Sequence, residues 1–490
     1  MASSDATVHN ETCPLLHHSH VEAQTVVLPT PLPKGQFAAL CAVRLVDPLT
    51  FTQLFPYVND FMSDLHVTDD PSRIGFYSGL VESIFAICQL CSIYPWAKIS
   101  DVIGRRTVIL AGLLSTVVVT LAFGLSKSLE MVLITRCLGG LLSGTVAAVL
   151  SALGEMTDST NQAYAIPIFG LMWPFGAIVG PLIGGTFSHG ASKYPHLFGY
   201  TIFEENPYFL PCLISSLVTF IGVLLGFIFL EETHPDARQG RDGKCNSMKS
   251  HRVADDIPVP EQKPMSVKDL MALPAMCALV TSGFVLSFIS TAFDVIFVLF
   301  CFSSIESGGL GFSASQIGYC LAISGFIAVG LQICLMPYLL RWFDSARLYV
   351  FCMGLWPFGY LCLPFLNAIA RGGLVGDNGL DASTMGVLWI GIAFIYLVVR
   401  VSTLAYSLHL ILVKERSPSP ASLSQSHGVV QFAMCSARAF APFLASSLFA
   451  VSIDNDILGG YLWVIVMVII SVFASVSSRN VLPDRKTNVI

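Results

Sequence analysis

Trp96-Ala97-Lys98-Ile99-Ser100-Asp101-Val102-Ile103-Gly104-Arg105-Arg106 is a short charged sequence between two long apolar segments. It is too short to form a domain, so we expect a tight loop between two membrane helices. The excess of basic residues places this loop on the cytoplasmic side. Gly104 would permit a sharp reversal of the chain, while Asp101 could pair with Arg105 or accept N–H groups at the start of the next helix. A loop that only sets the topology is the alternative interpretation.

The composition of the chain excludes a water-soluble core of this size. Apolar residues make up 54% of the 490 residues and charged residues only 12%, whereas soluble domains carry about 25% charged residues. The 14 Cys lie mostly within apolar segments, where they act as small packing residues. The sequence therefore predicts an all-α polytopic membrane protein.

Twelve apolar spans follow from the hydropathy pattern, each near the roughly 20 residues that cross a bilayer. We place them at 37–60, 74–95, 107–126, 129–152, 162–188, 207–230, 274–301, 314–340, 347–369, 383–412, 422–451 and 459–478. A hydrophilic cytoplasmic linker at 231–270 then separates two six-helix bundles, 36–230 and 271–480. Six plus six spans predict an internal repeat. In the second copy, 338–347 keeps the position and charge of the first loop but lacks its Gly-Arg-Arg sequence.

The distribution of basic residues indicates the orientation of the spans. If both termini are cytoplasmic, only four of the 26 Lys and Arg fall in outside loops, namely Arg73, Lys127, Lys193 and Arg371. Since basic residues concentrate in cytoplasmic loops, we expect a disordered cytoplasmic tail at 1–35 and a second cytoplasmic tail at 481–490.

The loop sequence resembles the signature between the second and third helices of the major facilitator superfamily, a pattern of the type G-x-L-a-D-r-x-G-R-k. Asp101, Gly104, Arg105 and Arg106 match this pattern, whereas its first Gly and the residue after its Asp differ. The resemblance implies twelve transmembrane helices in two pseudo-repeats (the major facilitator fold) around a central cavity. It also implies that these four residues act in a gate that holds one transport state.

Span five carries Gly176-Ala177-Ile178-Val179-Gly180-Pro181-Leu182-Ile183-Gly184-Gly185. Glycines four residues apart share a helix face and let a neighbouring backbone approach, and Pro181 bends the helix. The whole string resembles the span-five signature of the drug:proton antiporter branch, and Arg136 with Gly140 resembles the R-x-x-x-G signature of its span four. The resemblance implies a role for Arg136 in proton transfer. The alternatives are plain helix packing and a structural tether to a backbone carbonyl.

Two further stretches resemble the zinc-induced-facilitator-like proteins and their fungal relatives. The first surrounds Arg44 and Asp47 in span one, where those proteins usually have Glu at the position of Asp47. The second contains His427, Gln431 and Arg438 in span eleven, which lie within about 40° of one another on a helix. Arg44 and Asp47 share one face, which suggests a proton acceptor or, equally, a salt bridge that only holds the helix.

Buried charges complete the set of candidate residues. Glu82 in span two and Asp294 in span seven lie within apolar segments, where a charge is costly and usually functional. We therefore identify Asp47, Glu82, Arg136 and Asp294 as candidates for proton coupling. Candidates for lining the cavity are Arg44, Arg400, His427, Gln431 and Arg438, with packed polar residues as the alternative.

These observations predict a secondary active transporter and no enzyme, since neither a nucleotide-binding loop nor a catalytic constellation is found. We expect proton-coupled export of small organic molecules or drugs, with a nutrient-sensing transceptor or an uncoupled facilitator as the alternatives. The expected partners are a small-molecule substrate, protons and the lipid bilayer; we expect a monomer, with no nucleic acid, cofactor or metal. Glu11-Thr12-Cys13-Pro14-Leu15-Leu16 has the form of an acidic dileucine sorting signal, so the vacuolar and plasma membranes are both expected locations.

Overall fold

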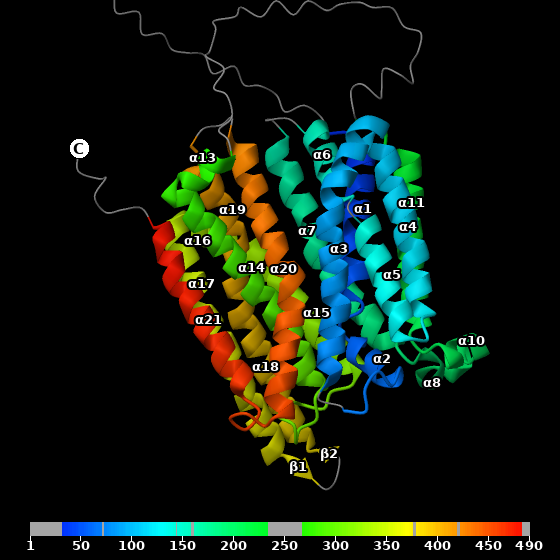
Figure 1. The fold of residues 1–490 in the computed structure, drawn as a ribbon. Coiled ribbons are helices and arrows are strands. Elements are labelled where there is room, and N and C mark those ends of the chain that lie inside the picture. Colours follow the sequence, from blue (N-terminus) through cyan, green and yellow to red (C-terminus); the bar gives the residue numbers. More distant parts are fainter. Residues whose placement is uncertain are drawn as a thin grey trace, which may run out of the picture.

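The computed structural model describes residues 32–70, 73–143, 145–157, 161–233, 267–375, 379–418 and 422–482. Most of the two predicted tails, with the sorting-signal sequence, and most of the central linker lie outside these residues. The described chain forms a bundle of long helices (Figure 1), and both of its ends lie at the same end of the bundle. We call this the termini end and the opposite one the far end.

The first half of the bundle contains the helices up to the central linker. They are α1 (Lys34–Thr52), α2 (Val58–Asp64), α3 (Ile74–Ile103), α4 (Arg105–Gly124), α5 (Leu129–Leu142), α6 (Val146–Met156), α7 (Gln162–Phe187), α8 (Gly190–Lys193), α9 (Pro195–Phe198), α10 (Thr201–Glu205) and α11 (Phe209–Phe229). The three short helices α8, α9 and α10 project at the far end (Figure 1).

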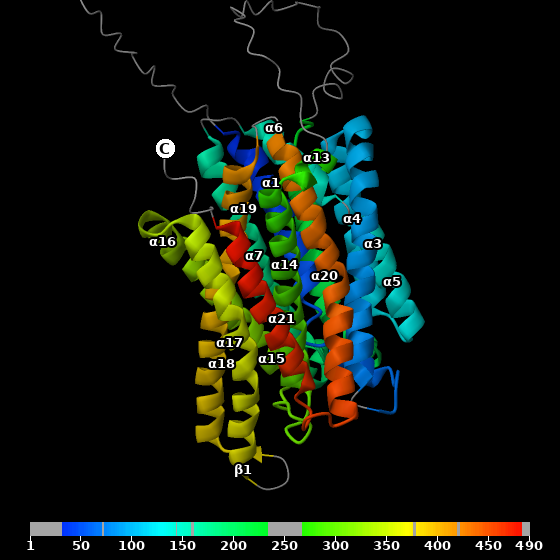
Figure 2. The ribbon, with the colours of Figure 1, turned by 60° about the vertical axis from the view of Figure 1, so that its left-hand side comes forward.

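The second half contains the remaining elements. They are α13 (Val267–Ala272), α14 (Pro274–Phe302), α15 (Ala314–Gly330), the π-helical turn η2 (Leu331–Leu335), α16 (Met336–Trp342), α17 (Ser345–Gly372), β1 (Leu374–Val375), β2 (Gly379–Leu380), α18 (Ala382–Thr403), α19 (Ala405–Arg416), α20 (Leu423–Asp454), α21 (Leu462–Ser478) and η4 (Arg479–Val481). The antiparallel pair β1–β2 joins α17 to α18 at the far end (Figure 2).

Within the described residues, ten helical segments are long and apolar enough to cross a membrane. They correspond to all the predicted spans except 37–60 and 129–152. The first of these two is α1, which carries Arg44 and Asp47 and is followed by the separate helix α2; the second is interrupted between α5 and α6. Both nevertheless belong to the bundle, because α1 packs on α7 and α11, and α5 packs on α3 and α4.

The structure corrects the predicted tight loop at 96–106. Helix α3 continues to Ile103, so that Lys98 lies on its last turns and not in a loop. Only Gly104 leaves helical geometry, with a φ of 103° that favours glycine, and α4 begins at Arg105. The reversal between the two helices is therefore made by a single residue. The side chain of Asp101 lies outside the described part of the chain.

The two halves repeat the same helix packing. Helix α1 packs on α7 as α14 packs on α20, α4 packs on α11 as α17 packs on α21, and α3 packs on α5 as α15 packs on α18. Between the halves, α7 packs on α15 and α20 packs on α3. The fourth span of each half is interrupted, between α5 and α6 in the first and between α18 and α19 in the second. The internal repeat expected from the order of the spans is thus present in the packing.

Glycines on α7 let two other helices approach it closely. A Cβ atom at Gly180 would lie only 2.6 Å from the carbonyl oxygen of Leu49 in α1. On another face, a Cβ atom at Gly185 would lie 2.6 Å from the carbonyl oxygen of Ala314 in α15. Since α1 belongs to the first half and α15 to the second, α7 fixes how the halves meet.

Gly180→Ala should destabilise the protein, because the added methyl group has no space against the α1 backbone. We expect a loss of about 1–3 kcal/mol, the usual cost of overpacking, seen as a lower Tm of the purified protein in detergent. Gly170→Ala is the matched control, since a Cβ atom at Gly170 on the same helix meets nothing within 4 Å. Equal changes in Tm for the two variants would contradict the close approach of α7 to α1.

Candidate functional site

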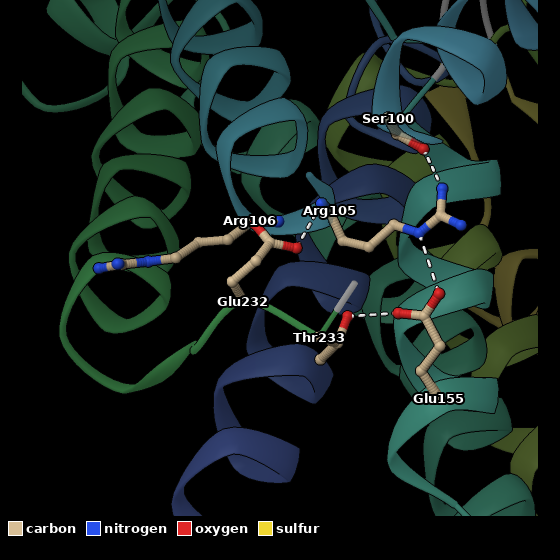
Figure 3. A network of polar contacts seen from close by, with 6 residues as sticks. All are labelled: Ser100, Arg105, Arg106, Glu155, Glu232 and Thr233. Carbon is tan, nitrogen blue, oxygen red and sulfur yellow. Dashed lines mark hydrogen bonds and ion pairs between the residues drawn. The ribbon is translucent and has the colours of Figure 1, made fainter. Parts of the chain in front are cut away.

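A polar network joins helix ends at the termini end of the first half (Figure 3). Glu232, which follows α11, accepts hydrogen bonds from the backbone N–H groups of Arg105 at 2.7 Å and Arg106 at 3.2 Å. The first N–H groups of a helix have no partner within the helix and carry its positive dipole end. The Glu232 carboxylate therefore caps α4 and ties it to the end of α11.

The Arg105 side chain extends this network to α3 and α6. Its Nε donates to the Glu155 carboxylate at 3.2 Å, and its guanidinium also donates to the Ser100 hydroxyl. The other Glu155 oxygen accepts a hydrogen bond from the Thr233 hydroxyl at 2.5 Å. Arg105 is only 8% exposed, whereas the Glu155 side chain is 26% exposed. The arginine side of this ion pair is therefore shielded from water more than in a surface pair.

Arg106 points away from Arg105 and towards α11 (Figure 3). Its Nη2 donates to the carbonyl oxygen of Phe227 at 2.6 Å, and its guanidinium lies 5.5 Å from the centre of the Phe227 ring. The two arginines therefore hold α4 against different neighbours, with α6 on one side and α11 on the other.

Sequence reasoning missed Glu155, Glu232 and Thr233. It assigned Glu232 and Thr233 to the hydrophilic linker at 231–270, whereas the structure places both residues in the network. A signal was available, because each glutamate lies at the end of a predicted span on the side of the membrane that carries the basic loop. Acids in that position are the natural partners of a buried arginine.

Three membrane-depth acids each lie beside an arginine, and the first such pair is on α1. Asp47 Oδ2 lies 3.6 Å from Arg44 Nη1, as expected for residues three apart on one face. The Arg44 guanidinium also packs on two rings of α7, at 5.3 Å from the centre of Trp173 and 5.7 Å from that of Phe169. These contacts place Arg44 between α1 and α7.

The second pair joins α3 and α5. Glu82 and Arg136 are both buried, and Arg136 is close enough to act electrostatically on Glu82. The guanidinium of Arg136 lies 4.6 Å from the centre of the Phe85 ring, and its Nε donates to the carbonyl oxygen of Val81 at 3.4 Å. Its Nη2 is buried and has no hydrogen-bond partner within the described chain.

The third pair joins α14 and α18. Arg400 Nη2 lies 3.2 Å from Asp294 Oδ1, and Arg400 Nε donates to the Ser324 hydroxyl of α15 at 2.6 Å. The Asp294 side chain is 34% exposed, more than that of Asp47 at 23%. Asp294 also acts electrostatically on Glu82 of the first half. Two of the predicted acids therefore approach each other from opposite halves.

The polar residues predicted on span eleven follow one side of α20. Gln431 Nε2 and Arg438 Nη2 both approach the Sγ atom of Cys435, at 3.5 Å and 3.0 Å. His427 is half-buried and acts electrostatically on His409 of α19. His409 is itself fixed, since its Nε2 lies 2.9 Å from the carbonyl oxygen of Leu279.

Polar contacts also join the halves near the far end. Lys193 Nζ donates to the Ser315 hydroxyl of α15 at 2.8 Å, and Ser315 donates to the carbonyl oxygen of Gly185 at 2.8 Å. On the other side, the Ser83 hydroxyl of α3 accepts a hydrogen bond from the backbone N–H of Phe443 in α20 at 2.9 Å. These contacts and the glycines of α7 hold the two halves together at the far end.

A family model described as Major Facilitator Superfamily matches residues 40–442. The chain is 40% identical to the major facilitator-type transporter psiT2 of Psilocybe cyanescens, over 91% of this chain and 89% of that protein. It is 26% identical to the multidrug transporter mfsB of Aspergillus fumigatus, over 86% and 79% of the two chains. It is 30% identical to protein zinc induced facilitator-like 1 of Arabidopsis thaliana, over 60% and 62%.

Among solved structures, a bacterial homologue of the human lysosomal transporter Spinster has a similar fold. The two chains superpose with a TM-score of 0.64 at 13% sequence identity, over 92% of this chain and 96% of the other.

A double-mutant cycle should detect the ion pair between Arg105 and Glu155 in the termini-end network. Arg105→Gln and Glu155→Gln should each destabilise the protein, whereas the double variant should lose less than the sum, with a coupling of about 0.5–3 kcal/mol. The measurement is the equilibrium free energy of unfolding in mixed micelles. Lys127 and Glu205 form the control pair, since they lie 3.6 Å apart but are both more than half exposed. Their coupling should stay below about 1 kcal/mol, and an equal coupling at both sites would contradict the shielding of Arg105.

Proposed function

The chain belongs to the major facilitator superfamily, and on this premise we propose that it exports small organic molecules in exchange for protons. It is a multi-pass membrane transporter and not an enzyme. Its similarity to a multidrug transporter supports export of organic compounds. In transporters built from two pseudo-repeats, the halves rock about a central site and expose it to each side in turn.

The ion pair between Asp294 and Arg400 is the observation that most supports proton coupling. Protonation of a carboxylate removes its attraction to a neighbouring arginine. This loosens the contact between two helices only if the carboxylate and the arginine belong to different helices. Arg44 and Asp47 share α1, and Glu82 is only 5% exposed. Asp294 is both accessible and paired across α14 and α18. We therefore assign the proton-carrying role to Asp294, with Asp47, Glu82 and Arg136 as supporting residues.

The orientation follows from the basic residues. Arg105 and Arg106 lie at the termini end, which is cytoplasmic under the positive-inside rule. The far end then faces outwards, and the contact of Lys193 with Ser315 helps to close the protein on that side. The gating role of Asp101, the monomeric state and the choice between vacuolar and plasma membranes remain predictions from the sequence.

Asp294→Asn should abolish substrate-dependent proton movement in sealed liposomes, because an amide cannot release a proton. The assay imposes a pH gradient and tests weak organic acids, cationic drugs, and zinc and potassium ions against the purified protein. Glu130→Gln is the control, since Glu130 is an exposed acid in the first turn of α5, and this variant should keep wild-type coupling.

Two results would contradict this proposal. Wild-type proton movement in Asp294→Asn would remove Asp294 as the carrier, and the same test on Asp47→Asn and Glu82→Gln would then identify another acid. Transport by the wild-type protein with no proton movement for any substrate would favour an uncoupled facilitator.

A further inference from the structure

Arg400 divides one edge of its guanidinium between two other helices. Its Nε donates to the Ser324 hydroxyl of α15 at 2.6 Å, and its Nη2 lies 3.2 Å from Asp294 Oδ1 of α14. The N–H groups of Nε and Nη2 point in the same direction, and arginines frequently offer such parallel donors to the two oxygens of one carboxylate. Here Asp294 receives only one of the two donors, because Ser324 accepts the other.

Ser324 is held at a fixed place beside Arg400. It is fully buried on α15, which packs on α18 of its own half and on α7 of the first half. The next residue, Gly325, faces Ile178 of α7 so closely that a Cβ atom there would collide with the Ile178 side chain. The α15 backbone is therefore fixed at this level by a contact between the halves, and the Ser324 hydroxyl is fixed with it.

The single hydrogen bond from Arg400 leaves Asp294 able to accept a proton. Within the described chain, the Asp294 carboxylate has no hydrogen-bond or ion-pair partner besides Arg400, and its side chain is 34% exposed. Two parallel hydrogen bonds from a guanidinium would stabilise the charged carboxylate more than one does. We propose that Ser324 is a positioning residue that limits Arg400 to one hydrogen bond with Asp294, so that Asp294 binds a proton more readily.

This inference rests on the proposed function, in which Asp294 carries the proton, and adds the residue that sets how firmly the proton is held. Ser324 has no charge, so removal of its hydroxyl changes the geometry of Arg400 and leaves the charges around Asp294 in place. The titratable groups around Asp294 are Arg400 and Tyr396 of α18, Tyr360 of α17, Tyr406 of α19, Glu82 of α3 and Arg438 of α20, which acts on Tyr406.

Ser324→Ala tests the role of the hydroxyl. It frees Arg400 Nε, and the Asp294 carboxylate, already bound by Nη2, is the acceptor beside it. We expect Asp294 in this variant to be half protonated about one pH unit lower than in the wild type, the shift that one charge-assisted hydrogen bond produces. The measurement is the infrared absorption of protonated carboxyl groups over a pH series, on full-length protein in detergent. The signal of Asp294 is the part that Asp294→Asn removes.

Two controls separate this effect from the loss of any buried hydroxyl. Ser402→Ala should keep the wild-type midpoint, because the Ser402 hydroxyl is equally buried and, among the described residues, bonds only to the carbonyl oxygen of Val398 in its own helix. In an Arg400→Lys background, Ser324→Ala should have no effect, since an ammonium group has no fixed pair of parallel donors to divide.

Four results would overturn the inference. They are an unchanged or higher midpoint in Ser324→Ala, an equal shift in Ser402→Ala, an equal shift in the Arg400→Lys background, and a wild-type spectrum from which Asp294→Asn removes no signal.

The infrared measurement uses no membrane, substrate or pH gradient, so it separates this inference from the proposed antiport. A lower midpoint in Ser324→Ala, together with no substrate-dependent proton movement in liposomes, would support the role of Ser324 and reject antiport. Proton-coupled transport by the wild type, with the same midpoint in the wild type and Ser324→Ala, would support antiport and reject the role of Ser324.

Discussion

The close approach of α7 to α1 and α15 is the constraint on which the relation between the two halves depends. Gly180 admits the α1 backbone on one face, and Gly185 admits the α15 backbone on another. The same helix carries Trp173, on which the Arg44 guanidinium packs. A shift of α7 would therefore displace both the contact between the halves and the Arg44 side chain. The glycines are needed because the contacts are to backbone, which cannot rotate away as a side chain can.

The starts of α4 and α17 show how one physical requirement is met in two ways. Both helices follow the loop that recurs in each half, and both need an acceptor for their first N–H groups. In the second half, Asp344 of the loop itself accepts the N–H of Arg347 at 3.2 Å. In the first half, Glu232 comes from beyond α11. Glu232 links distant helices, whereas Asp344 acts within its own loop. Because the two halves use different residues for the same purpose, the sequence repeat is weak although the packing repeat is clear.

The sequence was sufficient to predict ten of the twelve spans as long apolar helices, the repeat of the spans and the proximity of Arg44 to Asp47, because these depend on local periodicity and spacing. It also identified Asp294 from the cost of burying charge, and Arg400 separately as a candidate for lining the cavity. It did not predict that they pair, since hydropathy defines the depth of a residue and not the helix that faces it. The network of Arg105 with Glu155 was missed for the same reason. The extension of α3 to Ile103 was missed because charged residues at the end of a membrane helix lower the local hydropathy just as a loop does.

Glu82 of the first half and Asp294 of the second half are acids that act on each other electrostatically. In the proposed cycle, closing the halves would remove water from around these two acids and strengthen their repulsion. A proton on either acid would relieve that repulsion, so protonation would lower the free-energy cost of closure. Proton binding and the rocking of the halves would then be coupled through the cost of burying charge.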